Sequence, residues 1–189
     1  RAAAFAHWNY FLALEEDLDR LSRYVDFSGN DDAYSLEIAR LLLGASAEVD
    51  VVLKLLCKRF NPNSAASSIG MYHAEVNANC PNFINFETQL PRYGVTHQPW
   101  ISWTANQPPL WWSDHNKVKH QRDQYFERAT LKNCLNAVGG LFVAVLHLYE
   151  QEAANGELLQ LPRLFNVGNQ FFAGTQVGRY GHSFKYRVR

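Results

Sequence analysis

The residue types best suited to chemistry are concentrated between Trp111 and Asp123. An imidazole can exchange a proton near neutral pH, and Lys or Arg can bind a phosphate and stabilise the charge of its transition state. RNA cleavage that uses the ribose 2′-hydroxyl as the nucleophile needs no metal ion. The composition of this stretch therefore suits phosphate chemistry. It carries imidazoles, an amide, carboxylates and long cations: His115, His120, Asn116, Asp114, Asp123, Lys117, Lys119 and Arg122.

The stretch is predicted to be helical, and each residue of a helix turns by about 100° relative to the one before it. This rotation gathers several of the polar groups on one surface of the helix. The alternative is that this polar face only solvates the helix. The residues that share the face are His115, Asn116, Lys119, His120 and Asp123, with Arg122 beside His115.

On this face His120 is the predicted general acid–base, and Asn116 is the residue predicted to orient its imidazole. The remaining acids and the second imidazole are predicted to support the site. The predicted phosphate-binding residues are Lys117, Lys119 and Arg122. The predicted supporting residues in the stretch are Asp114, His115 and Asp123.

Glu48 is a further candidate, because its predicted helix places it on an otherwise apolar face with Leu41 and Val52. A buried carboxylate costs several kcal/mol unless a cation or a hydrogen-bond donor pairs with it. We expect that partner to come from residues 115–122, which would make Glu48 a supporting residue of the same site. A structural ion pair between core helices is the alternative.

Five helices are predicted from apolar residues that recur at three- and four-residue steps and from N-cap and stop signals. The second and the last are apolar almost all the way round, so we expect them to touch each other in the core. Pro108 and Pro109 are expected to open the fourth helix. The predicted helices cover residues 3–24, 33–60, 64–79, 113–128 and 129–151.

Prolines interrupt the chain between residues 80 and 110, which we expect to be a long aromatic and Pro-rich loop. Residues 83–86 and 93–95 are candidate short strands within it. The Trp residues near its end can either close a core or stack on bases. Residues 156–189 lack a helical period and are predicted to be an irregular tail with a possible hairpin at Gly174 or Gly178.

The predicted fold class is therefore all-α, with one domain over residues 1–155. That domain would be a helical bundle of four to five helices, with the long loop as an insertion. The tail from residue 156 would be irregular or a short hairpin.

The overall composition excludes a disordered chain, because hydrophobic residues make up 47% and charged residues 19%. A net charge of zero also excludes a generically basic nucleic-acid coat protein. The charges are uneven, however: residues 1–60 carry a net charge of −3 and residues 115–189 a net charge of +5. This asymmetry suits self-association or an anionic ligand, and a chance asymmetry of a solvated surface is the alternative.

The three cysteines, Cys57, Cys80 and Cys134, are widely spaced and odd in number, which argues against a disulfide framework or a structural zinc. Cys57 and Cys134 are predicted to be buried thiols, and the expected compartment is the reducing cytoplasm. No apolar run approaches the length of about 18 residues that a membrane helix needs, so no membrane is expected. No motif implies a metal or a cofactor.

The run from Asn116 through His120 to Arg122, placed before a long apolar helix, resembles the HEPN superfamily. That resemblance implies an all-helical, usually dimeric bundle found in prokaryotic defence and toxin–antitoxin systems. Active HEPN members are metal-independent ribonucleases with an Arg, an adjacent polar residue and a His four to six residues after the Arg. His120 matches the motif His, and Asn116 or Asp114 matches the polar position. No Arg stands at the required spacing, and Lys117, Lys119 or Arg122 would have to supply the charge.

Three hypotheses follow. The first is an HEPN-like homodimer that binds RNA or a nucleotide and, in its strongest form, cleaves RNA as a metal-independent endoribonuclease. The second is a non-catalytic HEPN-like module that assembles with a partner protein of a defence system, which the missing Arg favours. The third is a structural domain whose last helix packs against a partner.

Overall fold

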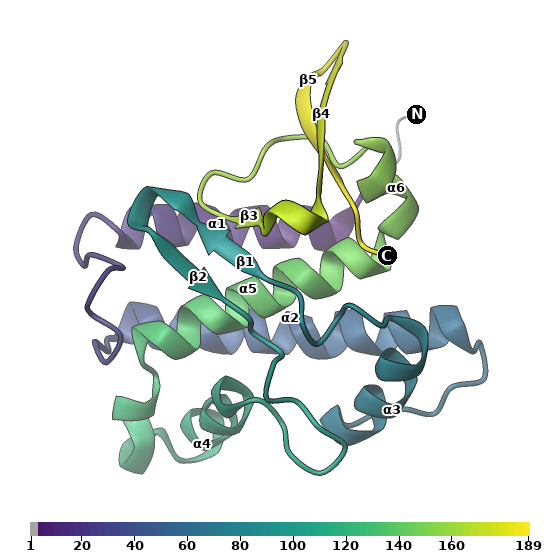
Figure 1. Ribbon diagram of the computed structural model, residues 1–189. Coiled ribbons are helices and arrows are strands. Elements are labelled where there is room, and N and C mark those ends of the chain that lie inside the picture. Colours follow the sequence, from purple (N-terminus) through teal and green to yellow (C-terminus); the bar gives the residue numbers. More distant parts are fainter. Residues whose placement is uncertain (1–3) are drawn as a thin grey trace.

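The fold is organised around one central helix, α5 (Leu131–Leu148). The computed structural model describes residues 4–189. Figure 1 shows α5 running beside α2 (Leu36–Phe60) and α1 (Ala6–Leu21), with α4 (Leu110–Tyr125) against the opposite side of the pair. The packing of α2 on α5 is the most extensive between any two elements. The prediction that the second and last long helices form the core is confirmed.

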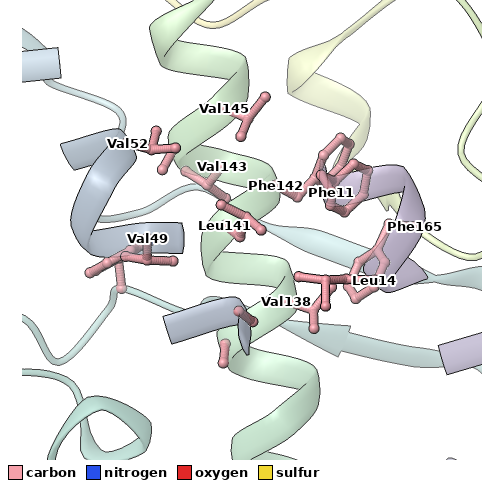
Figure 2. Close-up of a cluster of buried hydrophobic side chains, with 14 of the residues drawn as sticks. Phe11, Leu14, Val49, Val52, Val138, Leu141, Phe142, Val143, Val145 and Phe165 are labelled. Carbon is pink, nitrogen blue, oxygen red and sulfur yellow. The ribbon is translucent and has the colours of Figure 1, made fainter. Parts of the chain in front are cut away.

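The sequence of α5 explains why it lies in the centre. Lys132 near its start is its only Lys, Arg, Asp or Glu, and every residue from Ala137 to His147 is buried. An apolar helix of this kind is stable only when neighbours cover it on all sides. In Figure 2, Phe11 of α1 and Val49 of α2 approach α5 from different directions, around Leu141.

Side-chain caps fix the starts of α2 and α5. The Ser35 hydroxyl accepts a hydrogen bond from the Ile38 amide at 3.1 Å, and the Thr130 hydroxyl accepts one from the Asn133 amide at 3.2 Å.

The remaining helices are α3 (Ile69–Asn79) and the short α6 (Glu150–Asn155). The predicted final helix therefore stops at Leu148, and a separate turn of helix follows it.

The expectation of an all-α bundle is wrong, because the chain also forms two antiparallel sheets. The first has the strand order β2 (Val95–His97), β1 (Thr88–Leu90), β3 (Asn166–Val167), so β1 pairs with both of the other strands. The second is the hairpin of β4 and β5. The strands are β1 (Thr88–Leu90), β2 (Val95–His97), β3 (Asn166–Val167), β4 (Phe172–Gly178) and β5 (Gly181–Tyr186). Three 3₁₀ turns, η1 (Pro91–Tyr93), η2 (Phe126–Arg128) and η3 (Asn169–Phe171), complete the elements.

The predicted long loop contains a β-hairpin, and its two strands are shifted by a few residues along the sequence from the strands that we expected. Residues 83–86 form a turn rather than a strand, and the second strand begins at Val95. Gly94 has a φ of +62°, a conformation that glycine adopts without a steric penalty and that closes the connection between β1 and β2. Strands of three residues are too short to show an alternating pattern in the sequence.

The predicted irregular tail is also ordered into strands. β3 adds to β1 through the pair Thr88 and Val167, and the hairpin of β4 and β5 turns at Arg179–Tyr180, next to Gly178. In Figure 1 this hairpin projects from the body on the side opposite α4. The tail thus completes the first sheet instead of trailing along the surface.

The glycine pair of α5 is where the first sheet and the Trp cluster meet the core. A Cβ added at Gly139 would lie 3.0 Å from Thr88 Oγ1, and one added at Gly140 would lie 3.0 Å from Trp111 Cζ2. Trp100 Nε1 donates to the Gly140 carbonyl at 3.2 Å. All five Trp residues are buried, so the Trp cluster closes the core and does not offer a base-stacking surface.

A buried carboxylate attaches the tail to α1. Glu15 Oε1 accepts hydrogen bonds from the amides of Leu164 and Phe165, and Oε2 accepts one from Arg163, each at 2.8 Å. Burial raises the pKa of Glu15, and the three amides oppose that shift. This contact spans about 150 positions along the chain, and nothing in the sequence near Glu15 predicts it.

Truncation of the central helix should be costly. Leu141 is fully buried, so Leu141→Ala should lower the free energy of unfolding by about 2–5 kcal/mol. The matched control is Leu55→Ala on α2, whose side chain is 39% exposed and which should cost about 1 kcal/mol. Urea denaturation measures both, and equal losses would contradict the central position of α5.

The Glu15 contact can be tested with an isosteric change. Glu15→Gln turns one acceptor oxygen into an amide donor that faces a backbone N–H, and it should lower the free energy of unfolding by about 1–3 kcal/mol. Glu16→Gln, in the neighbouring exposed surface pair with Arg20, should change it by less than about 0.5 kcal/mol. Thermal unfolding of the two variants provides the comparison.

Candidate functional site

The candidate site is α4, which presents one buried and one exposed face. Pro109 precedes its first residue with a φ of −57°, and Trp111, Trp112 and Val118 point into the core. The helix is interrupted at Gln121, which has a φ of −143° and a ψ of 51°. Residues after this kink do not follow the regular 100° rotation, so the predicted common face does not extend to them.

The exposed face carries most of the residues singled out in the sequence. Lys119, His120 and Arg122 form no salt bridge and no side-chain hydrogen bond with any of residues 4–189. We call these three exposed residues the basic face; Lys119 and His120 precede the kink at Gln121, and Arg122 follows it. The exposed residues of the stretch are Asn116, Lys117, Lys119, His120, Gln121, Arg122 and Asp123.

Glu48 does not belong to this site. Its Oε1 lies 2.5 Å from His7 Nδ1 of α1, and its side chain is largely buried. The prediction that Glu48 needs a partner is confirmed, but the prediction that residues 115–122 supply it is wrong. Helical spacing fixes which face of α2 holds Glu48, but it does not fix which helix packs there.

Asp114 lies on the buried face and links α4 to α5. Its Oδ2 accepts a hydrogen bond from Asn133 Nδ2 at 2.9 Å, and Asn133 also donates to the Arg128 carbonyl at 3.0 Å. Lys117 Nζ lies 3.7 Å from the other oxygen, Oδ1. The carboxylate therefore anchors the helix that carries the basic face.

His115 is also buried, so the prediction that it shares the exposed face is wrong. Its Nδ1–H donates to the Trp112 carbonyl at 2.7 Å, which fixes the neutral tautomer. Burial lowers the pKa of His115 to about 4, and nearby Lys119 and His120 act in the same direction. A group that stays neutral to this pH does not serve as an acid near neutrality.

A pocket of about 500 Å³ lies beside α4. Asp114 and Leu110 of α4 line one side of it, and Tyr34 lines another. Arg128 and Lys132 also line it, although nothing about their spacing in the sequence marked them as site residues. His120 is not among the residues that form this pocket.

Comparisons with known proteins do not assign the chain to a family. No protein-family model, curated protein or solved structure matches it. The HEPN resemblance therefore has no support from relatives, and the all-helical fold that it implies disagrees with the two sheets.

Three further properties bear on the site and the core. In the described part of the chain, no group of three or more His, Cys, Asp and Glu side chains is placed to hold a metal ion. The expectation that no apolar run reaches the length of a membrane helix is wrong for α5, which within residues 4–189 is long and apolar enough by length and composition alone; 83% of it is buried inside the fold. Cys57 and Cys134 are buried free thiols, as predicted.

The buried histidine should make stability depend on pH. Because the pKa of His115 is about 4 in the folded chain and about 6.5 when unfolded, the unfolded chain binds the proton first as pH falls. The contribution of His115 is therefore lost between those two values, by about 1–2 kcal/mol between pH 7 and pH 5. Burial also lowers the pKa of His147 to about 4, and this adds a similar loss to the wild type and to the variant alike. Urea denaturation at both pH values should show a smaller loss for His115→Gln than for the wild type. An identical pH dependence in both proteins would contradict the assignment.

Proposed function

We propose that this protein is a non-catalytic RNA-binding module whose basic face on α4 contacts the phosphate backbone. The observation that carries the proposal is the exposure of Lys119, His120 and Arg122 without any acidic partner within residues 4–189. In protein–nucleic acid complexes, Lys and Arg side chains contact the phosphate oxygens, so a nucleic-acid backbone would supply the missing anions.

Charge repulsion supports an external anion. Three groups able to be cationic within four residues repel one another unless a negative charge lies among them. Glu48 is paired with His7, and the neighbouring Asp123 forms no salt bridge with the three. The basic face therefore lacks an internal counterion, and an anion from outside the chain would relieve the repulsion.

The geometry favours binding over cleavage. A general acid–base needs a partner that holds its ring against the substrate, and no described group makes a hydrogen bond to His120. Asn116, predicted to orient this imidazole, makes no hydrogen bond to it either. The Arg of the ribonuclease motif is absent from the sequence. We also propose that the chain associates with a second copy of itself or with a defence-system partner. A second chain would have to supply the groups that a cleavage site here lacks.

Loss of the basic face should weaken RNA binding in a salt-dependent way. We expect Lys119→Gln/Arg122→Gln to lower the slope of log K against log salt by about 1.4 for single-stranded RNA, because each lost phosphate contact removes about 0.7. Fluorescence anisotropy between about 50 and 200 mM salt measures this slope. Lys58→Gln is the control, because Lys58 of α2 is exposed and forms no salt bridge within residues 4–189, and it should leave the slope unchanged. Equal binding by the double variant and the wild type would contradict the proposal.

Incubation of the same RNA with the protein tests whether the protein only binds RNA or also cleaves it. In EDTA we expect no cleavage, and we expect His120→Ala to change the free energy of unfolding by less than about 0.5 kcal/mol because its side chain is exposed. Metal-free cleavage that disappears in His120→Ala would show that the ribonuclease hypothesis is the right one.

A further inference from the structure

The hairpin of β4 and β5 has an outer strand edge without a partner. Residues 174–178 of β4 pair in regular register with residues 181–185 of β5. Gly178 and Gly181 flank the two-residue turn as a hydrogen-bonded pair, and such pairs alternate along an antiparallel ladder. Thr175 and Val177 therefore turn their N–H and C=O groups outward. Among residues 4–189, no backbone group outside the hairpin bonds to them.

This β4 edge is exposed and lacks the features that usually keep strand edges apart, which are charged side chains, Pro and bulges. Every residue from Thr175 to His182 is exposed, and Figure 1 shows the hairpin projecting from the body. β4 contains no charged residue and no Pro, and its bulge lies at its base, between Phe172 and Gly174. β5 differs, because it packs on α6 and carries Lys185. The β4 edge is therefore free to accept a further strand.

The sequence of β4 is complementary to a second copy of itself. In an antiparallel pair about a two-fold axis at Gln176, Thr175 lies opposite Val177 of the second copy, and the same contact occurs twice. These are the residues whose backbone groups point outward, so each contact can exchange two hydrogen bonds. Thr and Val favour strands and pack well as a cross-strand pair. No charged side chain of β4 faces a like charge in this register.

Charge and stability favour a second copy over an unrelated strand. The chain has a net charge of zero, so two copies do not repel each other as a whole. An uncharged edge offers nothing that would select a charged peptide, whereas the register with its own copy satisfies all the outward groups of Thr175 and Val177. A hairpin of two strands is also only marginally stable in water, and a sheet of four strands would stabilise both projecting hairpins.

We infer that the chain forms a two-fold homodimer in which the β4 edges of two copies pair into one four-stranded sheet. The inference rests on the association with a second copy proposed above and names the surface that makes it. It does not depend on the RNA contact, because the hairpin projects on the side of the body opposite α4, which carries the basic face. A short strand edge makes a small interface, so the dimer should form reversibly.

Cysteine cross-linking tests the register. At the two-fold axis residue 176 faces its own copy in a non-hydrogen-bonded pair, whose Cα atoms lie about 4.5 Å apart, within the range of a disulfide. Gln176→Cys should therefore give a disulfide-linked dimer when oxidised with copper phenanthroline. Val177→Cys is the matched control: its two copies would lie diagonally, about 7–8 Å apart, and should cross-link at least about tenfold more slowly. The wild type should not cross-link, because Cys57, Cys80 and Cys134 are buried.

Sedimentation velocity tests the β4 edge without a cross-link. The wild type should pass from monomer to dimer between about 1 and 300 µM, the range of a small reversible interface. Val177→Pro removes an outward N–H but no hydrogen bond to β5, and it should weaken the dimer at least about tenfold. His182→Pro removes an outward N–H from β5 instead, and it should dimerise as the wild type does. If Val177→Pro does not fold, as judged by circular dichroism, Val177→Lys replaces it, because this side chain is 68% exposed and two like charges would meet across the interface.

A wild type that stays monomeric over this range would overturn the inference, and so would equal cross-linking at residues 176 and 177. A dimer that is unaffected by the change at Val177 would also overturn it, but would leave the association with a second copy standing on another surface. Lys119→Gln/Arg122→Gln should dimerise as the wild type does, so RNA binding and dimerisation can fail separately.

Discussion

The burial of α5 on every side is the constraint on which the rest of the structure depends. Most of its length is apolar, and each uncovered face would expose hydrophobic surface to water. α1 and α2 cover two sides with side chains, whereas the glycine pair lets the first sheet and the Trp cluster approach the helix itself. The segments between the helices are therefore structural parts of the core.

The same constraint positions the candidate site. α4 packs on α5 through the Trp residues, and the hydrogen bond between Asp114 and Asn133 sets it against the start of that helix. Because the inner face of α4 is committed to these contacts, its cations are left on the outside. The pocket arises where the two helix starts and the Tyr34 segment meet. The basic face and the pocket are thus two consequences of one packing arrangement.

Buried polar groups connect parts of the chain that are far apart in sequence. Glu15 holds residues 163–165, Glu48 pairs with His7, and Asp114 bonds Asn133. In each case a carboxylate inside the fold finds donors, as the cost of burying an unpaired charge requires. This requirement predicted that Glu48 would be paired. It did not indicate the identity of the partner, because any donor that packing brings near would satisfy it.

Periodicity and residue types within a few turns were enough to predict α1 to α5, the burial of Cys57 and Cys134 and the polar composition of α4, but not the separate helix α6. The sequence by itself did not determine the sheets: β1 pairs with β3 across more than seventy positions, and strands of two or three residues carry no periodic signal. The kink at Gln121 and the burial of His115 were likewise decided by tertiary structure. Local spacing defines which side of an element a residue occupies, whereas contacts between distant segments decide whether that side meets water, the core or a pocket.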